Sequence, residues 1–394
     1  MPAPLDGIRI IDLTSMISGP LATMILGDQG ADVIKVEKLV SGDHVRSAGN
    51  LHAGTSAAFL NNNRNKRSIA IDLKSEQGLN ILNQLAATAD VFIQNFRPGV
   101  VDRMGVGEAA IRAIAPSIIY VSISGFGERG PYAHKPVYDP IIQALSGLAS
   151  IQGGADDARP RLVRTIVPDK LTGVTAAQAI STALFARERT GQGQHIRLSM
   201  LDSVVAFLWS SDMGSQTLMD AQIPQQRAAS FIDLIYETAD GYISVAVMSN
   251  REWVGLTRAL ERPEWLEDER FKTPSLREQN IDTRLSLIQE RLKSNTSEHW
   301  LTLLEAEDVP CTPVLTRSQM LEHPQVIENE IVTEEVHPLA GRLRQARPAA
   351  RFSETPTSIR RGAPGLGEHC DELLNELGFS ATQIDALRSA AIIK

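Results

Sequence analysis

Asp169 is the residue of this chain whose type and position best suit covalent chemistry. It follows Pro168 in the stretch Ile-Val-Pro-Asp-Lys-Leu-Thr-Gly (166–173), where a long helix is predicted to begin. One interpretation is a helix N-cap, because aspartate is among the residues favoured there. The other is a functional anion, because the N-terminus of a helix stabilises negative charge. The two interpretations are compatible.

Two further groups of polar residues have types that suit a binding site. Tyr138-Asp139 opens another helix-like stretch, where capping and packing are the simplest roles. Basic residues occur near strand ends and loops at Lys38, Arg64, Lys66, Arg67, Lys74, Arg97 and Arg103. Each one alone suits solvated surface. Together they are able to hold a phosphate-rich ligand at the carboxyl edge of a parallel sheet.

Several common catalytic and binding motifs are missing from the sequence. The first strand is not followed by GxGxxG, and residues 125–130, which match that pattern formally, are followed by Pro131 and polar residues that start a helix poorly. We therefore interpret 125–130 as a turn-rich loop. A Walker loop, an HExxH zinc motif and a GxSxG serine motif are all absent. We expect no catalytic metal and no permanently bound cofactor.

The elements that must position these residues alternate between strand and helix in the first half. Strands are predicted at 8–13, 32–37, 68–73, 91–96, 118–124 and 195–200, with helices at 21–26, 77–87, 172–188 and 201–218. Such alternation is typical of an α/β fold, with a parallel sheet covered by helices on both faces.

The pattern changes after residue 219. Residues 220–230 are polar and irregular, which predicts a linker. Asp240-Gly241 lies between two strand-like runs and predicts a hairpin, followed by helices near 251–261, 282–293 and 297–306. We expect a large domain over 1–219, a smaller α+β domain over 231–330, and a segment 331–394 that returns to the large domain and ends in two helices near 368–377 and 381–390.

Composition limits the partners and the compartment. The 394 residues carry a net charge of −8, which disfavours binding to a nucleic-acid backbone. The chain has 2 cysteines, too few for a disulfide framework. The N-terminus does not read as a secretory signal, and no run of about 18 apolar residues predicts a membrane span. We expect a cytoplasmic protein that binds neither membrane nor nucleic acid.

An ordered set of short segments resembles the family III CoA-transferases, the group that contains formyl-CoA:oxalate and carnitine CoA-transferases and α-methylacyl-CoA racemase. The segments are LDGIRIIDLT (5–14), SGP (18–20), GADVIKVE (30–37), GDHVR (42–46), NKRSI (65–69), NFRPG (95–99), YD (138–139), Asp169 with Thr172-Gly173, TGQGQ (190–194), VPCTPV (309–314) and APGLGEH (363–369). Each motif alone is weak, but they occur in the right order over nearly the whole chain.

The resemblance implies a fold, an assembly and a reaction. It implies a Rossmann-like large domain, a small domain and two interlocked copies forming a homodimer. It implies that Asp169 attacks an acyl-CoA and passes through an anhydride and an aspartyl-CoA thioester while CoA moves to a carboxylic acid. By the same resemblance, Asp139 and Tyr138 support catalysis, and Ile17, Ser18 and Gly19 contact the substrate or oxyanion. The residues implied to bind CoA are Lys38, Lys74, Asn95, Phe96, Arg97 and Arg103.

Two departures from the family pattern narrow the expected activity. The racemase branch has a histidine immediately before the aspartate, where this chain has Tyr138, so a CoA-transferase is favoured over a racemase or epimerase. The formyl-CoA branch has a glutamine where this chain has Ile17, which suggests an acid larger than oxalate, such as a C4 or C5 dicarboxylate with succinyl-CoA as donor. A third alternative is an acyl-CoA-binding protein without turnover, which the intact Asp169 disfavours.

Overall fold

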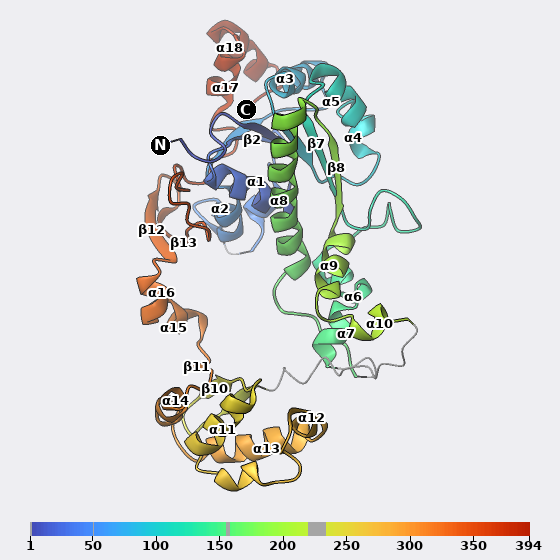
Figure 1. Cartoon of the computed structure of the whole chain (residues 1–394). Coiled ribbons are helices and arrows are strands. Elements are labelled where there is room, and N and C mark those ends of the chain that lie inside the picture. Colours follow the sequence, from blue (N-terminus) through green and yellow to red (C-terminus); the bar gives the residue numbers. More distant parts are fainter. Residues whose placement is uncertain (1, 50, 155–157, 220–233) are drawn as a thin grey trace. The chain divides into compact units, whose positions relative to one another are not determined.

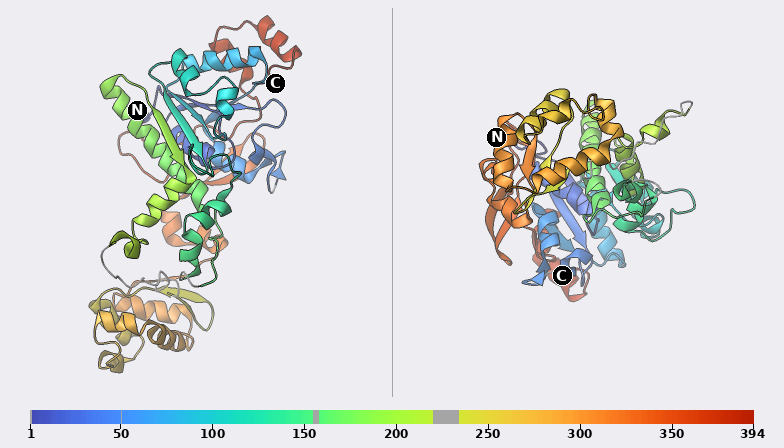
Figure 2. Two further views of the ribbon diagram at one scale, coloured as in Figure 1. Left: turned by 90° about the vertical axis from the view of Figure 1, so that its right-hand side faces the viewer. Right: turned by 90° about the horizontal axis from the view of Figure 1, so that it is seen from below.

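The computed structural model of the chain describes residues 2–49, 51–154, 158–219 and 234–394. The chain divides into two compact units, and the figures show their elements (Figures 1 and 2). Unit 1 comprises Met1–Ala149, Leu162–Met213 and Glu328–Lys394, and unit 2 comprises Ser150–Arg161 and Gly214–Ile327. The predicted linker 220–230 lies outside the described residues. The predicted domain boundaries remain a prediction.

Unit 1 is built on a six-stranded sheet in the order β5-β2-β1-β6-β7-β8, with all neighbouring strands parallel. Its strands are β1 (Arg9–Asp12), β2 (Asp32–Glu37), β5 (Lys66–Ala70), β6 (Val91–Gln94), β7 (Ile119–Ser124) and β8 (His195–Ser199). Each of the six strands predicted from sequence is present, so the α/β fold with a parallel sheet is confirmed. The strand order reverses direction between β1 and β6, and ligands bind at such switch points in open α/β sheets.

Helices cover both faces of this sheet because alternate strand residues point to opposite sides. On one face, Ile10 and Val33 pack against α1 and α8, and on the other, Ile11 and Ile34 pack against α3, α17 and α18. Figure 1 shows α1 and α8 side by side, and Figure 2 shows α17 and α18 away from α8. The helices of this unit are α1 (Ser18–Asp28), α2 (Ala57–Asn63), α3 (Glu76–Ala87), α4 (Val100–Arg103), α5 (Glu108–Ile114), α6 (Asp139–Leu145), α8 (Val167–Thr190), α9 (Met200–Trp209), α17 (Cys370–Glu376) and α18 (Ala381–Ser389), while α7 spans Leu148–Gly153.

Three segments differ from the sequence prediction. The helix predicted over 201–218 ends at Trp209, and a separate short helix, α10, covers Gly214–Thr217. The residues between them include Ser210, Ser211 and Asp212, whose short polar side chains compete for backbone hydrogen bonds and favour turns. The antiparallel hairpin of β12 (Val332–His337) and β13 (Gly341–Ala346) was not predicted. A second small ladder, β3 (Leu51–His52) with β4 (Thr55–Ser56), was also not predicted.

The C-terminal segment completes the large sheet unit. Ile393 forms an isolated antiparallel bridge with Ile71, and the Asp72 N–H donates to the Ile392 carbonyl at 2.8 Å. Leu373, Leu374 and Ile384 are buried in the same core as Ile69 on β5. Residues more than 300 positions apart in sequence therefore share one hydrophobic core.

Unit 2 contains a three-stranded antiparallel sheet in the order β11-β10-β9. Its core includes Trp253, Phe271 and Trp300. The predicted hairpin at Asp240-Gly241 is confirmed by the pairing of β9 with β10. The elements are β9 (Ile235–Glu237), β10 (Tyr242–Val245), α11 (Asn250–Ala259), α12 (Pro274–Gln279), α13 (Ile281–Leu292), α14 (Ser297–Ala306), β11 (Cys311–Pro313) and α15 (Arg317–Glu322), with α16 (Pro324–Glu328) at the return to unit 1.

The described residues contain neither a membrane-crossing helix nor a metal-binding cluster. No described helix combines the length and apolar character that crossing a bilayer requires. The described part of the chain also has no group of three or more histidine, cysteine or acidic residues arranged to hold a metal ion.

Candidate active site

Asp169 is the third residue of α8, the long helix that packs beside α1 on one face of the sheet. The N-cap of α8 is Ile166, whose side chain makes no capping hydrogen bond, so the interpretation of Asp169 as the N-cap is wrong. Pro168 occupies the first turn, where its missing N–H costs nothing. Because α8 leads into the start of β8, the N-terminus of α8 lies at the carboxyl edge of the sheet. The carboxylate is therefore half-buried at the edge where open α/β sheets bind ligands.

Asp139 is the direct neighbour of this carboxylate. It is the first residue of α6 and is only 3% exposed. One carboxylate oxygen, Oδ2, accepts a hydrogen bond from the Asp169 N–H at 3.3 Å. The other, Oδ1, accepts from Nε2 of Gln143 at 2.6 Å. Asp139 thus satisfies a free amide in the first turn of α8, and it brings a second negative charge next to Asp169.

The environment of Asp169 changes its acidity. Burial, together with the negative charge of Asp139, raises the pKa of Asp169 to about 6, while hydrogen bonding from the backbone and hydroxyl of Ser18 works in the opposite direction. Desolvation and a like charge both disfavour the ionised form. A carboxylate with such a pKa is ionised at neutral pH but is more basic than an ordinary aspartate, which suits a nucleophile.

Ser18 and Gly19 begin α1, the helix that lies beside α8. The Ser-Gly-Pro motif (18–20) forms the first turn of this helix. Two glycines allow the close packing here: a Cβ on Gly19 would lie 2.3 Å from Cβ of Thr14, and a Cβ on Gly173 would lie 2.8 Å from the Ser18 carbonyl oxygen. Neither distance is sterically possible for a side chain. The glycines therefore let the N-termini of α1 and α8 approach each other, with Ser18 next to Asp169.

The loop between β1 and α1 is held by a buried ion pair. Lys66 and Asp12 are both fully buried, and Nζ of Lys66 donates to Oδ2 of Asp12 at 3.0 Å, to the Pro20 carbonyl at 2.9 Å and to Oδ1 of Asn63 at 2.9 Å. Asp12 also accepts from the Thr14 N–H at 2.8 Å and from Thr23 Oγ1 at 2.7 Å. All three ammonium protons of Lys66 are donated in hydrogen bonds. The ion pair therefore links the first turn of α1, through the Pro20 carbonyl, to strands β1 and β5 of the sheet.

The acidities of this pair follow from the same contacts. Burial lowers the pKa of Lys66 to about 8, against the attraction of Asp12. Burial also works to raise the pKa of Asp12, but the charges of Lys66 and Lys35 hold it well below its ordinary value. Both groups are therefore charged at neutral pH. Sequence reasoning placed Lys66 among possible ligand-binding cations, whereas the structure shows its ammonium group buried and already bonded.

The same loop contains a residue in an unusual backbone conformation. Met16 has φ of 72°, in the left-handed region that favours glycine. Its N–H donates to Oδ1 of Asp43 at 3.1 Å, which supports this conformation. Ile17, next in sequence, is the N-cap of α1 and packs partly against the small core of Val45 and Phe59. Backbone strain of this kind is concentrated at functional sites.

The predicted CoA-binding residues lie at the carboxyl edge of the same sheet. Lys38 follows β2, Lys74 follows β5 and its bridge, Asn95, Phe96 and Arg97 follow β6, and Arg103 ends the short helix α4. The four basic side chains are exposed. Asn95 links the loop after β6 to the loop after β1 at the switch point. Its Oδ1 accepts from the Ser15 N–H at 3.0 Å, and its Nδ2 donates to the Ser15 carbonyl at 2.7 Å.

Tyr138 and the loop 125–130 are the remaining features predicted from the sequence. Tyr138 is the N-cap of α6, makes no side-chain capping bond and is 68% exposed. Residues 125–130 form bends and turns without a helix, so their interpretation as a turn-rich loop is confirmed. Sequence reasoning did not single out Asp12, although it lies in the motif 5–14, or Gln143, because both take their importance from contacts with residues distant in sequence.

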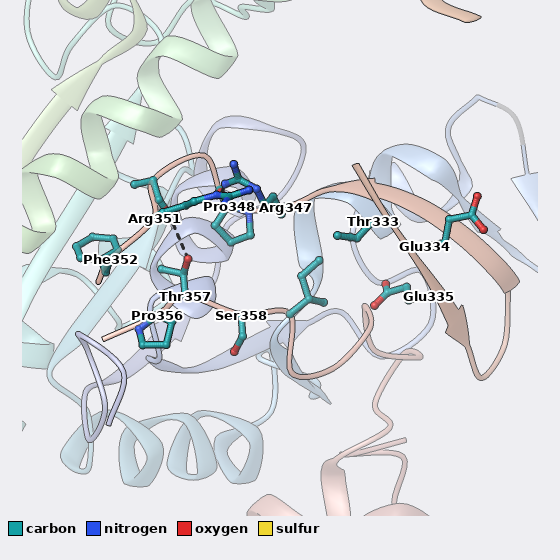
Figure 3. Close-up of a pocket in the computed structure, with 12 residues that line it drawn as sticks. Thr333, Glu334, Glu335, Arg347, Pro348, Arg351, Phe352, Pro356, Thr357 and Ser358 are labelled. Carbon is teal, nitrogen blue, oxygen red and sulfur yellow. Dashed lines mark hydrogen bonds between the residues drawn. The ribbon is translucent and has the colours of Figure 1, made fainter. Parts of the chain in front are cut away.

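A separate cavity of about 560 Å³ lies between the β12–β13 hairpin and residues 347–359 of unit 1 (Figure 3). Its lining includes Arg347 and Arg351 but none of the predicted site residues. Arg347 donates to the carbonyls of Glu330, Pro348 and Asn329, and Arg351 also donates to the Asn329 carbonyl. These guanidinium groups are already engaged with the protein backbone and are poorly placed to bind a phosphate.

Comparisons with known proteins agree with this arrangement. The model of CoA-transferase family III matches residues 5–370. The human succinyl-CoA:glutarate CoA-transferase is 36% identical to this chain, and the alignment covers 99% of this chain and 90% of that protein. The formyl-CoA:oxalate CoA-transferase of Streptomyces coelicolor is 33% identical, and the alignment covers 99% of each chain. The crystal structure of a CAIB/BAIF family protein from Brucella suis superposes with a TM-score of 0.84 at 32% identity, covering 96% of this chain and 100% of that one. This chain belongs to CoA-transferase family III, as its ordered motifs predicted.

Proposed function

We propose that this enzyme transfers CoA from an acyl-CoA to a dicarboxylic acid of four or five carbons through covalent chemistry on Asp169. The observation that carries this proposal is the environment of Asp169: a half-buried carboxylate in the first turn of α8, beside Asp139 and Ser18, with its pKa raised to about 6. A purely structural carboxylate at a helix N-terminus is normally stabilised in its charged form, which lowers its pKa. The opposite shift favours a reactive role.

The proposed reaction balances without any cofactor. The Asp169 carboxylate attacks the thioester carbonyl, the carbon–sulfur bond breaks, and a mixed anhydride and CoA thiolate form. The thiolate attacks the aspartyl carbonyl and expels the donor acid, leaving an aspartyl-CoA thioester. The acceptor carboxylate then attacks this thioester and releases thiolate, and the thiolate attacks the acceptor carbonyl of the new anhydride. The products are the new acyl-CoA and free Asp169.

The neighbouring residues receive roles in this scheme. Ser18 holds the Asp169 carboxylate through its backbone amide and hydroxyl, and the neighbouring Gly19 amide at the start of α1 is assigned to the charge that develops on the carbonyl oxygen. Asp139 keeps Asp169 basic and holds the start of α8. Tyr138 and Ile17 border the site as substrate contacts. Lys38, Lys74, Arg97 and Arg103 bind the CoA phosphates, with Asn95 and Phe96 at the switch point beside them.

The substrate assignment has two supports. Two proteins similar to this chain, from human and from Agrobacterium fabrum, are named for succinate or succinyl-CoA with glutarate, at 36% and 34% identity. The apolar Ile17 also stands where the formyl-CoA branch has a polar glutamine. The test is a mass-spectrometric screen of succinyl-CoA, acetyl-CoA and formyl-CoA against mixed mono- and dicarboxylates. Glutaryl-CoA formed from succinyl-CoA supports the assignment, and oxalyl-CoA as the main product contradicts it.

The pH dependence of the enzyme should reveal the acidity of Asp169. Because the protonated carboxyl is not nucleophilic and its pKa is raised to about 6, kcat/KM should be level above that pH and should fall about tenfold per pH unit below it. The Asp139→Asn variant removes the neighbouring charge, so its acid limb should move to lower pH. Both profiles are measured from initial rates with a saturating acceptor at about eight pH values, roughly between pH 4.5 and 8.5. An acid limb in the same place in both proteins would contradict the assigned electrostatics.

A homodimer is also part of the proposal. Large apolar side chains are exposed on the neighbouring helices α6, α8 and α9, including Ile141, Phe185, Phe207 and Trp209, which are between 47% and 62% exposed. Exposed apolar surface of this kind is typical of protein interfaces. Mass determination by light scattering during size exclusion measures the assembly. A monomer at micromolar concentration would contradict the homodimer.

The cytoplasmic location remains a prediction. The two free cysteines, Cys311 and Cys370, are compatible with a reducing compartment.

A further inference from the structure

Gln143 is a buried side chain that connects three parts of the site. It lies in α6, one turn after Asp139, and is only 2% exposed. Its Oε1 accepts from the Val163 N–H at 2.9 Å, and its Nε2 donates to Oδ1 of Asp139 at 2.6 Å and to the Val163 carbonyl at 3.3 Å. The amide is therefore bonded at both ends, to a carboxylate on its own helix and to the segment that leads into α8.

These bonds allow only one orientation of the amide. The Asp139 carboxylate only accepts hydrogen bonds, so the nitrogen of Gln143 must face it, and the oxygen is then free to accept the Val163 N–H. Once its first oxygen is held by Gln143, Asp139 presents the second oxygen to the Asp169 N–H at 3.3 Å. The contacts form a continuous chain from Val163 through Gln143 and Asp139 to Asp169.

We propose that Gln143 is a positioning residue for the nucleophile. It holds the Asp139 carboxylate against the Asp169 amide and fixes the segment before α8, so that the Asp169 side chain keeps a single orientation. This inference rests on the proposed role of Asp169. The residue is uncharged and no sequence motif singled it out. Its proposed role is to keep the two carboxylates in a fixed relative position. Misplacement of a reacting group by about 1 Å costs on the order of 100-fold in rate.

Few other charged groups face this assembly. On its own helix, α8, Asp169 is followed by Lys170, which is exposed and donates to Thr165, and the remaining charged residues, Arg187, Glu188 and Arg189, lie in the last turn. Helix α9, which packs on α6 and α8, carries Asp202, which is exposed, and α1 contributes Ser18 near the site and Asp28 at its far end. The segment that bonds Gln143 carries Arg164, which is exposed, one residue after Val163. A carboxyl group introduced at position 143 will therefore interact mainly with Asp139.

Two substitutions test the inference, and the first of them needs no known substrate. Gln143→Glu replaces the amide that donates to Asp139 with a second carboxyl group, and Gln143→Leu removes both hydrogen-bonding ends at similar size. Gln178→Leu, on the exposed surface of α8, is the matched control. The Asp139 and Asp169 carboxyls are titrated by NMR of protein labelled with ¹³C at aspartate carboxyl carbons, with their signals assigned through Asp139→Asn and Asp169→Asn. Thermal unfolding of every variant verifies folding.

In Gln143→Glu the new carboxyl group lies at hydrogen-bond distance from Asp139, so the two groups should share one proton, and the Asp139 signal should titrate roughly one to two pH units higher than in the wild-type protein. We expect Gln143→Leu to lower kcat by about tenfold or more with little change in KM for the acyl-CoA that the substrate screen identifies. In an Asp139→Asn background the effect of Gln143→Leu should largely disappear, because the residue acts through Asp139. Gln178→Leu should change none of these quantities.

Two outcomes would overturn the inference: an unchanged Asp139 midpoint in folded Gln143→Glu, or full additivity of Gln143→Leu with Asp139→Asn. Either result, obtained while Asp169→Ala is inactive, would leave the proposed function intact and reject only the role of Gln143. Full transfer activity in Asp169→Ala would instead reject the proposed function itself. The NMR titration distinguishes these cases because it needs no turnover.

Discussion

Asp169→Ala should lower kcat for CoA transfer by about 10³-fold or more, because the covalent route loses its nucleophile. The rest of the site remains in this variant, so acyl-CoA should still bind with little change in affinity. Wild-type enzyme incubated with the acyl-CoA donor and then with hydroxylamine should become inactive and carry a hydroxamate at Asp169, which peptide mass spectrometry locates. Asp169→Ala treated in the same way should carry no modification.

Asp169→Asn is the matched control for size, since it keeps the shape of the side chain and removes its negative charge. It should be as inactive as Asp169→Ala. Modification of a different carboxylate in the wild-type protein, or substantial transfer by both variants, would be incompatible with the proposed mechanism. Hydroxylamine without the acyl-CoA donor should not inactivate the enzyme, which separates trapping of an intermediate from general damage.

Lys66→Met should have the largest effect on stability. It removes one partner of a fully buried pair and leaves Asp12 charged among buried groups, and a change of this kind costs about 3 to 5 kcal/mol. The Pro20 carbonyl and the Asn63 amide oxygen also lose their donor. Urea unfolding at pH 7 measures the free energy of unfolding. Lys135→Met, an exposed lysine of the same unit, is the control and should change it by less than about 0.5 kcal/mol.

A double variant isolates the cause of the loss. In Asp12→Asn/Lys66→Met no unpaired charge is buried, so the double variant should be more stable than Lys66→Met alone. Because the pair holds the start of α1, Lys66→Met should also raise the rate of hydrogen exchange at residues 14–24. A free energy of unfolding equal to that of Lys135→Met would show that the buried pair contributes nothing to stability.

Local pattern predicted the large sheet well because its strands obey simple rules. The six strands of the parallel sheet are short segments rich in β-branched residues, and each was placed within a few residues of its position. The helix predicted over 201–218 was too long, because Ser210, Ser211 and Asp212 follow Trp209 and their short polar side chains favour a turn over a continued helix. The hairpin β12–β13 carries mostly charged and polar residues, so its strands show little hydrophobic alternation.

The candidate site was only partly predictable for a different reason. Family motifs pointed to Asp169, Asp139 and Ser18, and the structure brings these three together, although their catalytic roles remain predictions. The supporting contacts join residues far apart in sequence, such as Asp12 with Lys66 and Gln143 with Val163. Nothing in the local sequence around Lys66 distinguishes a buried, fully bonded ammonium group from a solvated one. Only the tertiary structure separates the two.

The shared core of β5 with the C-terminal segment has a consequence for biosynthesis. Ile69 and Ile71 are translated early, but the residues that cover them, from Leu373 to Ile393, leave the ribosome only when synthesis is nearly finished. An edge strand of the central sheet therefore stays uncovered while unit 2 is being made, and such surfaces attract chaperones or aggregate. A nascent chain arrested shortly before residue 370 should accordingly be far more sensitive to protease than the released protein.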